Sequence, residues 1–170
     1  MRKFPPLCRF WAIFLSPLRK EFLNAFQRCD ITRGMAILGR AQESQWLKLC
    51  VEQNKNLLIE GPVGVGKTHL VREGLKALKK VFLRIDGDQR YTEQKLVGGF
   101  DPALVLKQGY QKHSFLKGPL IEAMEKGCVL FINELNRMPD GVQNVLLPAI
   151  DEGRVDVPKI GTIQASPGFC

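Results

Sequence analysis

Residues 61–68, Gly-Pro-Val-Gly-Val-Gly-Lys-Thr, have residue types and a spacing suited to holding phosphate. They match the pattern G-x-x-x-x-G-K-[ST], in which a glycine-rich turn and a helix N-terminus surround an anion with backbone N–H groups. Gly64 and Gly66 are expected to adopt positive φ and to let the backbone approach the phosphates closely. Lys67 is expected to reach the β- and γ-phosphates, and the Thr68 hydroxyl to ligand Mg²⁺.

The segments on both sides of this turn support the same interpretation. Residues 56–59 read as a short buried strand, and Val71, Leu75 and Leu78 recur at the spacing of an amphipathic helix. A glycine-rich turn that matches by chance is the alternative, and the two flanks make it the weaker one. The predicted nucleotide-binding residues cover the turn and the start of the helix: Gly61, Pro62, Val63, Gly64, Val65, Gly66, Lys67, Thr68 and His69.

A second group of candidate residues follows the apolar run 128–132, which predicts a parallel strand covered on both faces. Asn133 and Glu134 end this run, and ligands of open α/β sheets bind at the carboxyl ends of the strands. Glu134 could orient or deprotonate an attacking water, while Thr68 and Asn133 hold Mg²⁺. We therefore predict Glu134 and Lys67 as catalytic residues; the alternative is that Glu134 is simply a polar strand end.

The chain alternates strand and helix patterns from residue 31 onward, with no internal repeat. Residues 91–118 are expected to be irregular, and Pro148 is expected to kink or loosen the last turn of its helix. Three strands joined by crossover helices predict a three-layer α/β sandwich with a parallel sheet. The remaining predicted elements are helix 40–53, strand 81–85, helix 119–127, a helix with an apolar stripe from Val142 to Ile150, and a hairpin over 154–165.

Size, charge and cysteine usage narrow the class of protein. With 170 residues there is room for one domain with a sizeable core. The net charge of +8 is compatible with nucleic-acid binding, but we find no basic patch interleaved with aromatic residues, and a mildly basic solvated surface is favoured. The five cysteines form no C-x-x-C pair, which argues against a disulfide framework or a zinc site and favours a reducing, cytoplasmic location.

Residues 1–30 are set apart by their composition, which is basic and rich in phenylalanine. The apolar run 7–15 is interrupted by Arg9 and is too short to span a bilayer. This segment is predicted to be an accessory extension. It is either a helix that lies on a membrane surface or a partner, or a non-native extension from an early start codon.

Taken together, these residues resemble the AAA+ ATPases and, within them, the MoxR and dynein-related branch. The similarity runs from about residue 37 to residue 169. The matching segments are 39–43, which resembles the segment near the adenine; 61–68, the Walker A motif; 96–100 and 117–120, which resemble the loop before the next helix; 129–137, Walker B with the Asn-Arg tail of the branch; and 143–147 with 151–152, which resemble the following helix.

The resemblance implies a P-loop NTPase three-layer αβα sandwich over residues 31–170. It also implies ATP as substrate, Mg²⁺ as cofactor and a homo-oligomeric, hexameric ring. ATP hydrolysis in such a ring would remodel a protein client, as a chaperone does, with an arginine from the neighbouring subunit stabilising charge during phosphoryl transfer.

Two departures from the family pattern matter. Most members have Asp where this chain has Asn133, and an amide oxygen accepts hydrogen bonds but carries no charge. Weaker Mg²⁺ binding and slower turnover are therefore expected, with Glu134 still able to act. In addition, Cys170 falls where the family's fourth strand begins, so its sensor Asn, arginine finger and helical lid are absent. We therefore expect a fragment of a longer ATPase, in which strand 56–59 has lost its neighbour.

Two other hypotheses stay open at the level of the sequence. The first is a module that binds nucleotide without hydrolysing it, which the missing sensor and finger favour. The second is the ATPase part of a nucleic-acid-processing machine, whose DNA binding would depend steeply on salt.

Overall fold

The computed structural model describes residues 40–170, and the extension predicted over residues 1–30 lies outside this range. The chain divides into two compact units between Lys80 and Val81. The described part of the first unit is 40–80, and the second unit is Val81–Cys170.

Residues 40–80 of the first unit contain two helices that pack against each other, α2 (Ala41–Glu52) and α3 (Lys67–Ala77). The apolar stripe predicted for α3 is confirmed, since Val71 and Leu75 are buried and Leu78 is half-buried. Helix α2 lies where residues 40–53 predicted a helix and buries most of its apolar side chains, including Leu47, Leu49, Cys50 and Val51.

The strand predicted at residues 56–59 is wrong. This segment is irregular, alternates between exposed and half-buried positions, and belongs to none of the sheets formed within residues 40–170. A β-strand is stabilised by the hydrogen bonds of its ladder and by cross-strand side-chain pairs, so an apolar composition alone does not make a strand.

The second unit is built on a parallel pair of strands, β1 (Phe82–Asp86) and β4 (Val129–Asn133). The pairing runs in register from Phe82↔Val129 to Asp86↔Asn133. Side chains alternate between the two faces, so Ile85, Leu130 and Ile132 lie on the face that packs on the core. The predicted parallel pairing is confirmed, whereas the predicted cover on both faces is not complete, because every residue of β4 is only half-buried.

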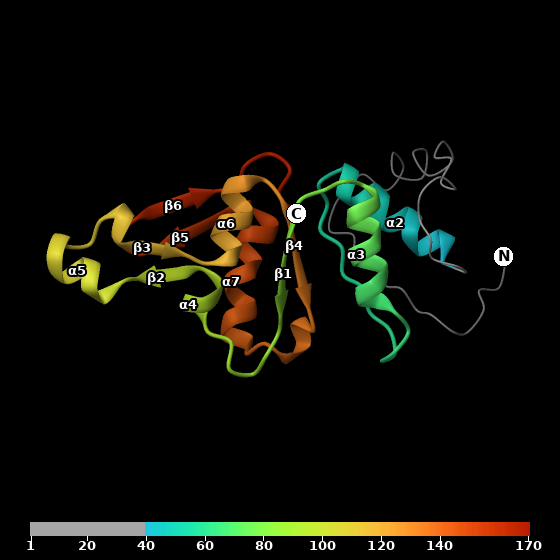
Figure 1. Ribbon diagram of the computed structural model, residues 1–170, viewed down its shortest axis with the longest axis horizontal. Coiled ribbons are helices and arrows are strands. Elements are labelled where there is room, and N and C mark those ends of the chain that lie inside the picture. Colours follow the sequence, from blue (N-terminus) through green and yellow to red (C-terminus); the bar gives the residue numbers. More distant parts are fainter. Residues whose placement is uncertain (1–39) are drawn as a thin grey trace. The chain divides into compact units, whose positions relative to one another are not determined.

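Two helices cover the core face of this pair, α6 (Pro119–Lys126) and α7 (Asp140–Asp151) (Figure 1). Pro119 starts α6 and Gly127 ends it with φ of 60°, both as predicted. The central core residues come from α6, α7, β1 and the last hairpin: Ile85, Leu120, Ile121, Met124, Val142, Leu146, Ala149, Val155 and Val157.

Helix α7 confirms most of its predicted stripe. Val142, Leu146 and Ala149 are buried and Val145 is half-buried, but Ile150 is exposed. The helix continues through Pro148 to Asp151, so Pro148 does not end it, and its loosening of the last turn stays a prediction.

Residues 91–118 are not irregular, contrary to the expectation. They form an antiparallel pair of three-residue strands that encloses short helices. Such short elements carry too little periodicity to be recognised, although Asp101 caps its helix through the N–H groups of Ala103 and Leu104. The elements are α4 (Glu93–Leu96), β2 (Gly98–Phe100), α5 (Pro102–Gln108), η1 (Lys112–Ser114) and β3 (Phe115–Lys117).

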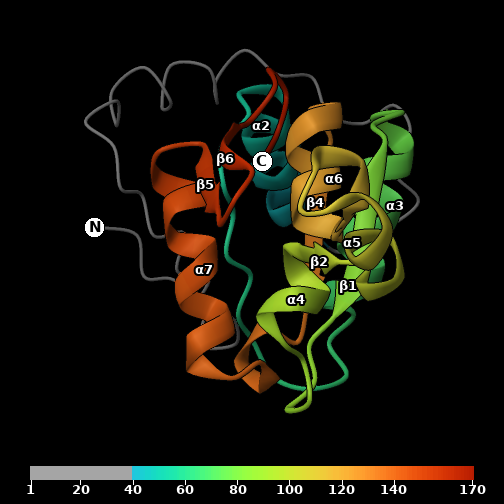
Figure 2. The same cartoon turned by 90° about the vertical axis from the view of Figure 1, so that its left-hand side faces the viewer.

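The predicted C-terminal hairpin is confirmed as β5 (Arg154–Val157) and β6 (Gly161–Gln164), beside α7 (Figure 2). After it, the chain crosses the end of α6, where the Ser166 N–H donates to the Met124 carbonyl at 2.7 Å. The carbonyl of Cys170 then accepts from the N–H of Leu130 on β4 at 2.8 Å. The last residues therefore lie along the edge of β4 that faces away from β1.

The end of α6 generates a stability prediction. Gly127 has φ of 60°, and a Cβ there would lie 2.3 Å from the carbonyl oxygen of Pro167. We expect Gly127→Ala to destabilise the protein by more than about 1 kcal/mol, because a left-handed backbone is unfavourable for an L-residue and the oxygen must also move. Urea unfolding measures the change. Gly141→Ala, in helix α7 with its nearest atom at 3.8 Å, should leave stability equal or raise it; equal effects of the two substitutions would contradict this account.

Candidate active site

The turn before α3 has a left-handed backbone at two glycines. Gly64 has φ of 83°, and Gly66, the N-cap residue of α3, has φ of 84°. A Cβ added to either residue would meet no atom within 4 Å. The predicted positive φ is confirmed at both positions, and the left-handed conformation, not a lack of space, is what favours glycine there. The predicted close approach to phosphates stays a prediction.

Lys67 is the first residue of α3, and its ammonium group lies over the turn. Its Nζ donates to the carbonyl oxygen of Gly61 at 2.8 Å and to that of Pro62 at 2.7 Å. These bonds place a positive charge beside the helix N-terminus, whose first N–H groups have no acceptor within the helix. Since the first turn of α3 contains no acidic residue, the local donors and charge suit an anion such as a nucleotide phosphate.

The other residues predicted for the first unit lie around the same turn. Thr68 and His69 are the second and third residues of α3, the former half-buried and the latter exposed. Val63 is fully exposed, so packing does not explain its presence in the turn. The phosphate and metal roles of these residues stay predictions.

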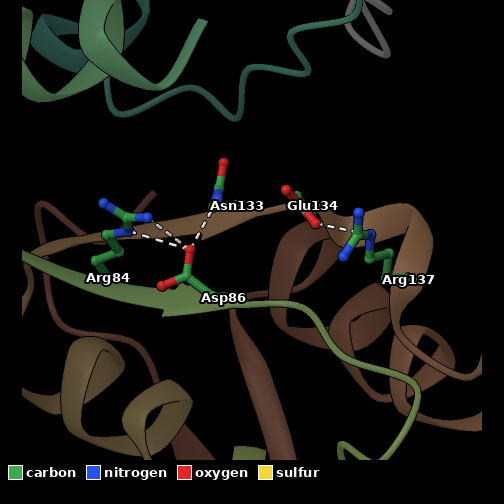
Figure 3. A network of polar contacts seen from close by, with 5 residues as sticks. All are labelled: Arg84, Asp86, Asn133, Glu134 and Arg137. Carbon is green, nitrogen blue, oxygen red and sulfur yellow. Dashed lines mark hydrogen bonds and ion pairs between the residues drawn. The ribbon is translucent and has the colours of Figure 1, made fainter. Parts of the chain in front are cut away.

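A second group of candidate residues, in the second unit, lies at the carboxyl ends of β1 and β4. Asp86 and Asn133 are register partners, and the Asn133 Nδ2 donates to Asp86 Oδ1 at 2.7 Å (Figure 3). The same oxygen accepts from Arg84, at 2.7 Å from Nη2 and 3.2 Å from Nε. These bonds, that of Arg84 first, lower the pKa of the Asp86 carboxyl. The ionised form therefore stabilises the fold near neutral pH, and this contribution is lost in acid as the pH falls through the lowered pKa.

Glu134 directly follows β4 in a left-handed conformation, with φ of 55° and ψ of 44°. It precedes the short helix η2 (Leu135–Arg137), and its Oε2 lies 2.7 Å from the Nε of Arg137 (Figure 3). On its other side, the backbone passes close to Gly87, where a Cβ would lie 2.2 Å from the Glu134 carbonyl oxygen. Glu134 is thus positioned by a tight turn, and non-glycine residues rarely adopt this conformation.

The residues proposed for Mg²⁺ offer the right kind of donor. An amide oxygen of Asn133 and a hydroxyl of Thr68 are hard oxygen ligands, which Mg²⁺ prefers. Within residues 40–170, no group of three or more His, Cys, Asp or Glu side chains is arranged to hold a metal ion. Each of these two donors is of a kind found around Mg²⁺ at nucleotide sites, where substrate phosphates and water supply the other ligands.

The fold is an α/β fold with a parallel sheet of the P-loop nucleoside triphosphatase type. A solved structure of a proposed ATPase from Cytophaga hutchinsonii matches it with a TM-score of 0.55 and 21% identity, over 88% of this chain and 40% of that one. The family follows from the sequence match: the chain belongs to the AAA domain family, dynein-related subfamily, whose profile matches residues 56–169. The predicted family and fold class are confirmed.

Similar proteins occur in staphylococci. An uncharacterised protein of Staphylococcus epidermidis is 32% identical over 124 residues, which are 72% of this chain and 47% of that protein. A further uncharacterised protein, from Staphylococcus haemolyticus, is 33% identical over 118 residues, 68% of this chain and 44% of its own length. The chain therefore spans about half the length of the curated relatives it matches.

Within residues 40–170, none of the helices combines the length and hydrophobicity that a bilayer crossing requires.

The contacts of Arg84 and Asp86 were missed by the sequence analysis, which ended its predicted strand at residue 85, whereas β1 runs to Asp86. The signal that could have found them is their alternation at the end of β1. Residues 84 and 86 share a face, and the ends of two parallel strands meet at one edge, so Asp86 could have been placed beside Asn133.

The backbone of Glu134 yields a prediction about strain. Glu134→Gly should be more stable than Glu134→Ala by about 1 kcal/mol, because only glycine adopts the left-handed region without cost. Asn144, exposed in the middle of α7, is the matched control, where Gly should be less stable than Ala by about 1 kcal/mol. Thermal unfolding of the four variants measures both differences. The same order of Gly and Ala at the two positions would contradict a strained Glu134.

Proposed function

We propose that this chain binds ATP through residues 61–68, and that the whole protein hydrolyses ATP with Mg²⁺ to remodel a protein partner. The observation that carries the proposal is the turn itself. Two glycines with φ near 84° lead into α3, and the ammonium of Lys67 lies over the turn. Membership of the AAA family supports the same activity.

The chemistry of binding follows from the donors of the turn. Phosphate oxygens accept hydrogen bonds from backbone N–H groups at the start of α3, where the helix dipole also favours negative charge. The carbonyl oxygens of Gly61 and Pro62 hold Lys67 at the turn, and its ammonium would exchange these bonds for bonds to the β- and γ-phosphates. The Thr68 hydroxyl would hold the metal.

Glu134 is proposed to act on the attacking water. Its carboxylate would accept a hydrogen bond from this water, orient it for attack on the γ-phosphate and take its proton. The ion pair with Arg137 restricts the side chain, and the tight turn fixes its backbone. Bound Mg²⁺ would neutralise charge on the phosphate oxygens, held by Thr68 and Asn133.

The assembly and the client are further parts of the proposal. A homo-oligomeric, hexameric ring would bring an arginine of a neighbouring subunit to the nucleotide, and hydrolysis would drive movement against an unidentified protein client. A cytoplasmic location and an accessory role for residues 1–30 belong to the same proposal.

A second candidate function is nucleotide binding without hydrolysis. The uncharged amide of Asn133 favours it, because an amide stabilises Mg²⁺ less than a carboxylate does. Phosphate release measured beside a fluorescent-nucleotide titration separates the two functions.

Lys67→Ala tests the binding site. We expect ATP affinity to fall by roughly tenfold or more, since hydrogen bonds to charged groups contribute about 1.5–3 kcal/mol. Titration with a fluorescent ATP analogue measures it. Lys76→Ala removes a lysine from the last turn of the same helix, where it pairs with Glu73, and should leave the affinity unchanged. If Lys67→Ala bound ATP as tightly as the parent protein, the proposed site would be incorrect.

Glu134→Gln tests the water-orienting role. The amide keeps the size of the side chain but cannot accept a proton, so turnover should fall about 100-fold or more while ATP still binds. Phosphate release and nucleotide titration are measured on the same preparation. Full turnover in this variant would remove Glu134 from its proposed role.

A further inference from the structure

We propose that Asp86 is a positioning residue for Asn133: its carboxylate fixes the amide so that the Asn133 Oδ1 is presented as the acceptor toward Mg²⁺. This inference rests on the proposed function, which assigns Asn133 to the metal. It concerns position 133, where this chain has an amide and most of the family has a carboxylate.

A side-chain amide can adopt two opposite orientations, which exchange the positions of its oxygen and its NH₂ group. A carboxylate presents an acceptor oxygen whichever way it turns, whereas an amide presents an oxygen on one side and an NH₂ donor on the other. A donor directed at a cation would be repulsive. An asparagine can therefore serve Mg²⁺ only if its neighbours prevent the flipped arrangement.

Asp86 provides this selection. An ionised carboxylate only accepts hydrogen bonds, so the amide must turn its nitrogen toward it. The Asn133 Nδ2 lies 2.7 Å from Asp86 Oδ1, and the Asn133 oxygen is directed away from Asp86 (Figure 3). The bond joins register partners of the parallel ladder, so the backbone itself keeps the two side chains opposite each other.

The position of the Asp86 side chain is in turn restricted by Arg84, which lies on the same strand. Arg84 donates to the same oxygen from Nη2 and Nε, and its guanidinium lies 5.9 Å from the centre of the Phe131 ring on β4. These side chains occupy alternate positions on one face of the pair, opposite the face of Ile85 and Ile132 that packs on the core. Arg84 and Phe131 therefore restrict Asp86, and Asp86 restricts Asn133.

The same geometry changes the effect expected of a carboxylate at position 133. In Asn133→Asp, two carboxylates would face each other where the present bond is 2.7 Å long, and their repulsion would oppose the gain in charge toward the metal. The gain should appear fully only in the exchanged pair, D86N with N133D, where the new amide at position 86 can donate to the new carboxylate. The two positions are predicted to be strongly non-additive.

The experiment compares D86N, N133D and the double variant with the parent full chain. Mn²⁺ is the metal probe, with its binding in the presence of ADP followed by electron paramagnetic resonance, and ADP affinity is measured separately with EDTA present. D86N should weaken Mn²⁺ binding roughly tenfold, as loss of an outer partner of a ligand commonly does. The double variant should bind Mn²⁺ more tightly than N133D alone. ADP affinity in EDTA should be equal in all four proteins.

A metal-free measurement tests the positioning directly. The Asn133 side-chain NH₂ signal in ¹H–¹⁵N spectra of the apo protein should shift and exchange faster with solvent in D86N. Asp88→Asn, which removes an exposed carboxylate two residues further along, should change neither this signal nor Mn²⁺ binding. If D86N does not fold, the parent spectrum decides: protected Nδ2 protons support the pairing, and rapidly exchanging ones overturn it.

Two results would overturn the inference. One is an Asn133 NH₂ signal that D86N leaves unchanged, and the other is N133D alone binding Mn²⁺ as tightly as the exchanged pair. Failure of the proposed function looks different, because the parent protein would then not bind ADP even in EDTA, while the amide signal would still report whether Asp86 orients Asn133.

Discussion

The parallel ladder between β1 and β4 is the constraint on which the second unit depends. Because the strands pair in register to their last residues, Asp86 and Asn133 meet at one edge and Glu134 begins its turn there. The alternation along both strands also separates two environments. One face carries Ile85 and its neighbours into the core, and the other carries the polar network of Arg84.

The AAA family, the turn at 61–68 and most helices could be predicted from the sequence, because local rules specify them. Positive φ at Gly64 and Gly66 follows from a glycine pattern, and Pro119 and Gly127 mark the ends of α6 by conformational preferences of single residues. Helix α7 was recognisable because its apolar residues recur at helical spacing from Val142 to Ala149.

What the sequence could not provide depends on pairing and on contacts between distant residues. The apolar run 56–59 has the composition of a strand but joins no sheet within the described residues, and composition does not show which segments pair. Strands of three residues, such as β2 and β3, form because they pair with each other, and their short sequences do not predict this pairing. The bond from Asn133 to Asp86 joins positions 47 residues apart and becomes visible only once the register is known.

Because the backbone of Glu134 is left-handed, two requirements act on its side chain: it must tolerate this backbone, and it must extend a carboxylate to the same place. Asn, Asp and Gly tolerate that backbone best, yet they are shorter than glutamate or have no side chain, and so would not extend a carboxylate to the same place. Gln keeps the length but not the basicity. A glutamate that persists there does so against the preference of its own backbone, which is how sequence comparison could separate selection for chemistry from selection for folding at this position.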